Sequence, residues 1–167
     1  MSLSSSPTDT VVTHVLAGNF IIELIEDADA FCRDDWGSDD SEVRVQPGRV
    51  GLESIDELHL PEIRLRGFAQ RPTDTPSGEL GTWPVAFATG RVEIWGGDAD
   101  VAELALNLPQ SPNNRYLMRV TRERKDIGEQ DADDYTLACY ERDGEPTRDL
   151  ERFTVDFWPA TVMRPEH

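Results

Sequence analysis

The sequence has few of the residues that cross-link small domains or bind transition metals. Its 167 residues include two cysteines and three histidines, which are Cys32, Cys139, His14, His59 and His167. Two distant cysteines do not build a disulfide framework, and scattered histidines lack zinc-ligand spacing. We expect no metal and no cofactor. Cys139 lies in an apolar run, so we interpret it as a small buried residue rather than a nucleophile.

Long apolar runs and catalytic motifs are also missing. No run approaches the roughly 20 apolar residues that cross a bilayer, and residues 1–10 have no signal-peptide pattern, so we expect a cytoplasmic protein. The sequence has no glycine-rich phosphate loop and no Gly-x-Ser-x-Gly. We therefore expect a protein that is not an enzyme. Paired carboxylates for glycoside hydrolysis stay open, but 33 acidic residues make a chance pair inevitable.

Positive charge is scarce. The 16 lysines and arginines face 33 aspartates and glutamates, which gives a net charge of −17. A negative field of this size repels nucleic acid and anionic membranes and attracts basic proteins. We expect a basic protein partner, and neither nucleic acid nor a membrane. The alternative is that the surplus acid serves solubility alone.

The sequence is rich in short runs of β-branched and aromatic residues, separated by Gly, Pro, Asn and Asp. This pattern predicts an all-β fold, an antiparallel β-sandwich of jelly-roll type with about nine strands and acidic loops. The segments that carry it are Gly18–Ile25, Glu42–Val45, Arg49–Glu53, Ile63–Phe68, Trp83–Phe87, Gly90–Trp95, Val101–Leu108, Arg115–Val120, Tyr135–Tyr140 and Phe153–Trp158.

Local signals refine this organisation. Pro47-Gly48 fits a type II turn, which makes the segments on either side a hairpin. Val101–Leu108 contains helix formers, but its leucines keep period two and favour a strand. We also leave open a brief helix around Ile55–Leu60. We expect one domain over residues 11–160, with flexible tails at 1–10 and 161–167.

Acidic residues are concentrated in two segments. Glu23–Glu42 holds nine acidic residues and one arginine, and Asp126–Asp134 holds five acidic residues and no basic one. Buried unpaired carboxylates are costly, so we expect both segments to be surface loops. Trp36 is either an exposed protein-binding anchor or a plug beneath its own loop. The candidate partner-binding residues are Asp27, Asp29, Asp34, Asp35, Trp36, Asp39, Asp40, Asp131, Asp133 and Asp134.

Several pieces in order resemble a known family. They are Phe20–Asp27 followed by Trp36, the strand pair split at Pro47-Gly48, Thr89–Trp95, Leu108-Pro109 with Arg115–Val120, Tyr135–Leu137, and Phe157–Pro159. Over residues 12–160 the chain resembles the competence protein J-like (ComJ-like) family, whose type member inhibits a DNA-entry nuclease. Thr89 departs from the family's usual Ser, and the segment between Cys139 and Phe153 is unfamiliar. The resemblance implies a β-sandwich that binds a protein such as a nuclease, and assigns no site residues.

Two hypotheses follow. In the first, the protein is an acidic inhibitor or immunity-like module that blocks the basic cleft of a nuclease or similar partner. In the second, it is a small-ligand or carbohydrate-binding sandwich, or an enzyme on that fold, with Trp95 stacking on sugar rings. A concave pocket lined by tryptophan favours the second hypothesis, and an acidic convex face favours the first.

Overall fold

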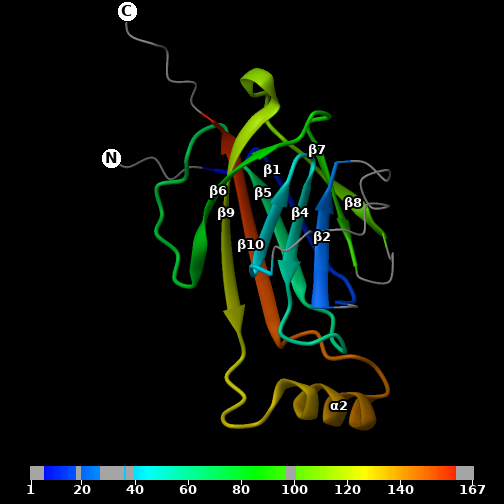
Figure 1. Ribbon diagram of the computed structural model, residues 1–167. Helices are drawn as coiled ribbons and strands as arrows, with labels where there is room; N and C mark the ends of the chain where they lie inside the picture. Colours follow the sequence, from blue (N-terminus) through cyan, green and yellow to red (C-terminus); the bar gives the residue numbers. More distant parts are fainter. Residues whose placement is uncertain (1–5, 18–19, 27–35, 37–39, 97–100, 161–167) are drawn as a thin grey trace, which may run out of the picture.

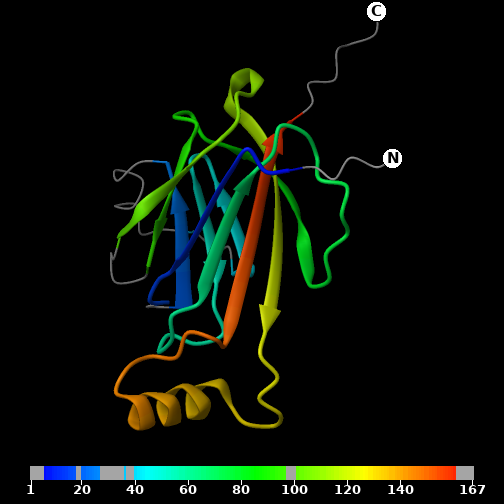
Figure 2. The same ribbon diagram turned by 180° about the vertical axis from the view of Figure 1, so that it is seen from behind.

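The described part of the chain folds into two β-sheets, and a helix lies across one end of them (Figures 1 and 2). The computed structural model describes residues 6–17, 20–26, 36, 40–96 and 101–160, with the backbone alone for 101–104. The strands are β1 (Asp9–His14), β2 (Ile21–Ile25), β3 (Val43–Gln46), β4 (Arg49–Glu53), β5 (Glu62–Gly67), β6 (Glu79–Ala86), β7 (Arg91–Trp95), β8 (Val101–Asn107), β9 (Arg115–Arg124) and β10 (Glu151–Pro159). The helix is α2 (Ala132–Asp143), and a 3₁₀ turn, η2, spans Pro112–Asn114.

The two sheets have five strands each. Sheet A has the order β1-β5-β10-β9-β6 and sheet B the order β3-β4-β2-β7-β8. Neighbouring strands are antiparallel, except that β10 runs parallel to β5 in the centre of sheet A. The predicted all-β sandwich is confirmed, and β3 and β4 form the hairpin expected around Pro47-Gly48, with Gly48 at φ +72°.

The core lies between the sheets and follows from the period-two pattern of the strands. In β5, Ile63 and Leu65 are buried while Arg64 and Arg66 face outward. Phe87 and Phe157 meet edge to face with ring centroids 5.7 Å apart, a favoured geometry for aromatic pairs. Burial of each such large side chain contributes about 1.5–3 kcal/mol, so the inward faces of the sheets hold the fold together.

The sequence misassigned one element and missed another. Tyr135–Tyr140, predicted as a strand, lies inside α2. Its tyrosines and threonine favour strands, but the acidic first turn and the glycine after the helix outweigh that preference. The strand β1 was not predicted, and Ile55–Leu60 contains no helix. Among the described residues, no helix is long and apolar enough to span a bilayer.

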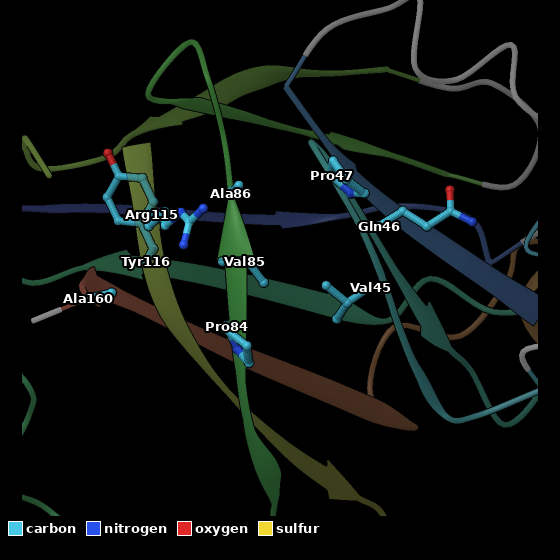
Figure 3. Close-up of a pocket in the computed structure, with 9 residues that line it drawn as sticks. All are labelled: Val45, Gln46, Pro47, Pro84, Val85, Ala86, Arg115, Tyr116 and Ala160. Atoms are coloured by element: carbon cyan, nitrogen blue, oxygen red, sulfur yellow. The ribbon is translucent and has the colours of Figure 1, made fainter. Parts of the chain in front are cut away.

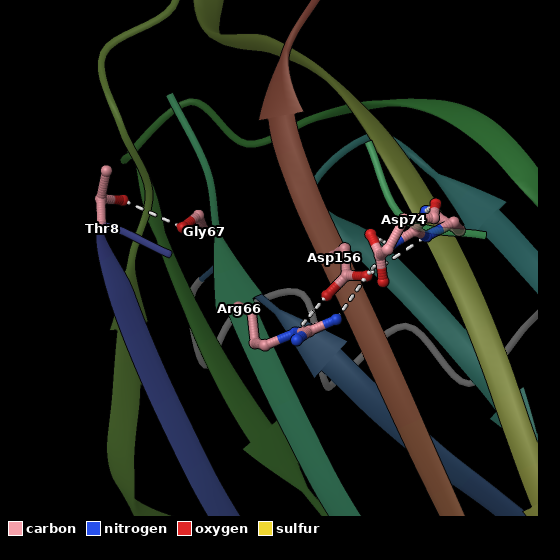
Figure 4. Close-up of polar contacts among 6 residues, drawn as sticks. Thr8, Arg66, Gly67, Asp74 and Asp156 are labelled. Carbon is pink, nitrogen blue, oxygen red and sulfur yellow. Dashed lines mark hydrogen bonds and ion pairs between the residues drawn. The ribbon is translucent and has the colours of Figure 1, made fainter. Parts of the chain in front are cut away.

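A buried carboxylate ties together the outer face of sheet A (Figure 4). Asp156, on the central strand β10, is fully buried. It accepts hydrogen bonds from Arg66 Nε on β5 at 2.7 Å and from Arg119 Nη2 on β9 at 2.8 Å. Arg119 Nη2 also donates to the Asp74 carboxylate at 3.1 Å, in the connection between β5 and β6. This network joins three adjacent strands across the one parallel pairing of the sheet.

Asp156→Asn is expected to lower the free energy of unfolding by about 3–5 kcal/mol, because the Arg119 guanidinium loses its buried charged partner and keeps only the exposed Asp74 carboxylate. Urea denaturation measures this loss. The control is Asp143→Asn, which removes the partner of Arg142 from an exposed pair and is expected to change stability little. Equal losses in the two variants would contradict a structural role for the network.

Candidate protein-interaction surface

The helix α2 crosses the end of the sandwich where β9 ends and β10 begins (Figures 1 and 2). Asp131 is its N-cap residue, and Asp133 and Asp134 occupy the first turn, where negative charge complements the helix dipole. Gly144 ends the helix in the left-handed conformation, at φ +74°, and its N–H donates to the carbonyl of Tyr140 at 2.8 Å. This is the glycine C-cap that many helices use, so local sequence signals fix both ends of α2.

Buried polar contacts hold α2 against the sandwich. Thr136 and Cys139 are the buried residues of the helix. The Thr136 hydroxyl donates to the buried carboxylate of Asp56, which lies in the connection between β4 and β5. On the approach to the helix, the Lys125 ammonium lies over the ring of Tyr135, at 5.5 Å from its centroid. The side of α2 opposite Thr136 is left free for solvent or a partner.

Beneath the helix lies a group of residues that in other settings carries catalysis. The Ser54 hydroxyl lies 2.7 Å from His59 Nε2 and 2.7 Å from the Glu151 carboxylate, and Arg124 Nε donates to the second Glu151 oxygen at 2.8 Å. Ser54, His59 and Glu151 are at most 3% exposed. A nucleophile must reach its substrate, so this cluster is structural. His59 is therefore a hydrogen-bonded internal residue.

Two carboxyl groups share the junction between α2 and the sandwich. A hydrogen bond to Asp56 and the nearby charge of that residue raise the pKa of Asp133. Burial alone raises the pKa of Asp56, but hydrogen bonds from Asp133 and Thr136 hold it below its usual value. One carboxyl of the pair therefore keeps its proton more readily than the other, which lets two acids sit together at the start of α2.

The outward side of α2 exposes apolar side chains within a ring of acids. Leu137 is 49% exposed and Tyr140 is 43% exposed. Asp133 lies four residues before Leu137, and Glu141 four residues after it, so all three share a face with Tyr140. From residue 126 to 145 the sequence holds eight carboxylates and one arginine. That arginine, Arg142, is paired with Asp143. The surface formed by Asp133, Asp134, Leu137, Tyr140 and Glu141 is called the α2 face below.

The structure places half of the sequence-predicted site residues. Asp131, Asp133 and Asp134 are exposed and lie together at the start of α2, on a helix rather than in the expected loop. Asp40 is exposed just before β3. The remaining predicted aspartates lie outside the described residues; they are Asp27, Asp29, Asp34, Asp35 and Asp39. Leu137 and Tyr140 were not among the predicted residues; the signals that could have identified them are the helix N-cap at Asp131 and the C-cap at Gly144.

Trp36 packs on the outer face of sheet B. The Arg49 guanidinium lies over its ring, 3.9 Å from the centroid, and Arg49 is also in a buried ion pair with Glu23. The Trp36 ring lies 2.8 Å from the position that a Cβ atom at residue 51 would occupy, so glycine is needed there. Trp36 is half-buried in this position.

Stability is expected to fall as the pH drops from about 7.5 to 5.5. Burial lowers the pKa of His59, against the opposing effect of Glu151. The unfolded chain, with a histidine pKa near 6.5, then binds more protons than the folded protein, so the contribution of His59 is complete above about pH 6.5 and lost as pH falls toward the lowered value. Thermal unfolding across this range measures the slope. His59→Gln should flatten it, and an unchanged slope in that variant would rule out His59 as its source.

Comparison with known proteins shows what this fold resembles. No protein-family description matches the sequence, and no curated protein matches it either. Among solved structures, the chain is similar to the crystal structure of ComJ from Bacillus subtilis, an inhibitor of the DNA degrading activity of NucA. The two share 8% sequence identity over 95% of this chain and 100% of that chain, with a TM-score of 0.54. This chain therefore has a ComJ-like fold, as its sequence resemblance implied.

Proposed function

We propose that this protein is an inhibitor that binds a basic protein through the α2 face, with a nuclease as the partner class. The observation that carries the proposal is the pair Leu137 and Tyr140, exposed on a helix whose surroundings are almost wholly acidic. The ComJ-like fold supports an inhibitor-type role, because ComJ inhibits a DNA-degrading enzyme. The fold by itself does not select a function, so the surface carries the argument.

Electrostatics and apolar contact have separate tasks in this mechanism. A nuclease binds phosphates through lysine and arginine, so its cleft attracts carboxylates as well as DNA. Asp133, Asp134 and Glu141 steer the encounter and occupy those cations. Tyr140 then enters a desolvated position between the partners, where an aromatic side chain contributes most to slow dissociation. Occupation of the cleft excludes DNA by charge and by volume.

The carbohydrate-binding alternative has less support. Trp95 lies on the outer face of sheet B, half-buried, and its indole N–H donates to Glu93 at 3.2 Å. Stacking on a sugar requires a tryptophan that forms part of a concave surface. The apolar pocket between β3 and β6 has no tryptophan in its lining.

Affinity capture from extracts of the source cell tests the proposal. At about 0.05 M salt the protein is expected to retain a basic nuclease, and at about 0.5 M salt to release it, because screening removes the steering field. Once the nuclease is in hand, its DNA-degrading activity should fall on addition of this protein. Tyr140→Ala should raise the dissociation rate by roughly 10- to 30-fold. Neutralising Asp134 and Glu141 together should slow association.

Matched variants separate the α2 face from general surface effects. Val12→Ala removes an exposed apolar side chain on β1, and Glu79→Gln removes an exposed charge on β6. Both are expected to bind and inhibit like the unchanged protein. A captured nuclease that binds equally well to the Tyr140 and charge variants, or that stays fully active in the complex, would refute the proposal.

A further inference from the structure

A second surface feature lies at the other end of the molecule. A pocket of about 410 Å³ opens between β3, the edge strand of sheet B, and β6, the edge strand of sheet A (Figure 3). The strand β9 starts at this pocket and ends near α2 (Figure 1), and its ten residues span about 33 Å. The pocket is therefore separate from the α2 face. Its volume lies in the range of small-molecule sites, about 300–1,000 Å³.

The fold explains why the pocket is open. Along one side of the sandwich β1 contacts β8 and closes the gap between the sheets. Along the opposite side, the sheets are bridged at the Pro47-Gly48 turn, where the Gly48 N–H donates to the Ala86 carbonyl at 2.8 Å. The space beside this bridge is lined mainly by apolar groups, among them Val45, Val85 and the ring of Tyr116. The Tyr116 hydroxyl donates to the Pro109 carbonyl at 2.8 Å, so its polar end is already satisfied.

A cation lies at the rim of this apolar pocket. Arg115 is exposed, lines the pocket, and forms no ion pair within the described part of the chain (Figure 3). In contrast, most other described arginines and lysines are paired with carboxylates; examples are Arg49, Arg66, Arg119, Arg122 and Arg124. Arg71 and Arg148 also form no ion pair within the described residues, but Arg115 is the arginine that lines this apolar pocket. Its planar guanidinium suits a carboxylate.

The sheet edges at the pocket are poorly suited to pairing with a peptide strand. Pro84 lies within β6 and Pro47 directly follows β3, and both line the pocket. Proline has no N–H to donate to an added strand and is a common means of blocking sheet edges. A compact ligand is not affected by these prolines, because it binds without forming hydrogen bonds to the backbone of a sheet edge.

We propose that the pocket binds a small monocarboxylate with an apolar body, of the medium-chain fatty acid class. The hydrocarbon part contacts Val45, Val85 and Tyr116, and the carboxylate pairs with Arg115. The overall negative charge opposes the approach of an anion, but at about 0.1 M salt the Debye length is about 10 Å. The nearby guanidinium therefore dominates the final contact.

Titration of the full-length protein with sodium octanoate, followed by NMR of backbone amides and valine methyl groups, tests this. Signals of Val45, Val85 and Arg115 should shift together and saturate. Octylamine has the same chain with the opposite charge and should bind at least tenfold more weakly. Equal binding of octylamine, or shifts located elsewhere on the protein, would overturn the proposal.

Variants complete the test. Arg115→Gln should weaken octanoate binding by about tenfold, which corresponds to about 1.4 kcal/mol. Arg148→Gln, which removes another exposed arginine without an ion pair in the described structure, should leave it unchanged. Ala160→Trp fills the pocket from the end of β10 and should abolish binding. An apolar peptide with a free C-terminus serves as the competing occupant. If the peptide binds and octanoate does not, the site is a peptide groove and the proposal fails.

Discussion

The contact between Thr136 and Asp56 is the interaction on which the candidate surface depends. α2 buries little apolar area, since Thr136 and Cys139 are its buried residues. A typical hydrogen bond contributes about 1 kcal/mol net, whereas an unpaired buried carboxylate is costly. The hydrogen bond from Thr136 therefore stabilises both the buried Asp56 carboxylate and the position of the helix. Because one narrow polar side holds the helix, Leu137 and Tyr140 are free to face outward.

The distribution of ion pairs determines where unpaired negative charge lies on the surface of the protein. Buried carboxylates such as Glu23, Asp156 and Glu151 are matched by arginines on neighbouring strands. These pairs consume much of the chain's limited positive charge inside or along the sheets. Many of the other described carboxylates are exposed on and around α2, and the buried Asp56 is held by hydrogen bonds instead of a cation. The same shortage of cations thus leaves paired acids within the sheets and, on the helix, Asp133, Asp134 and Glu141 without an ion pair in the described structure.

Period-two alternation was enough to predict most strands, because a sheet buried on one face requires it. The helix was harder, since Tyr135 and Thr136 favour strands locally and the apolar spacing of α2 is weak. Its partner Asp56 is 80 residues away, so no local pattern could show that contact. Asp133 and Asp134 were found by charge alone, whereas the position of Trp36 over Arg49 depends on sheet B being formed.

The central place of β10 in sheet A imposes an order on biosynthesis. Until residues 151–159 have been made, β5 and β9 lack the strand that joins them, and sheet A exists as two separate pairs, β1 with β5 and β6 with β9. Each pair then presents an open edge to solvent or to a chaperone. Closure requires β10 to enter between them, with a parallel partner about 90 residues earlier, so sheet A is expected to close only after residues 151–159 have been made.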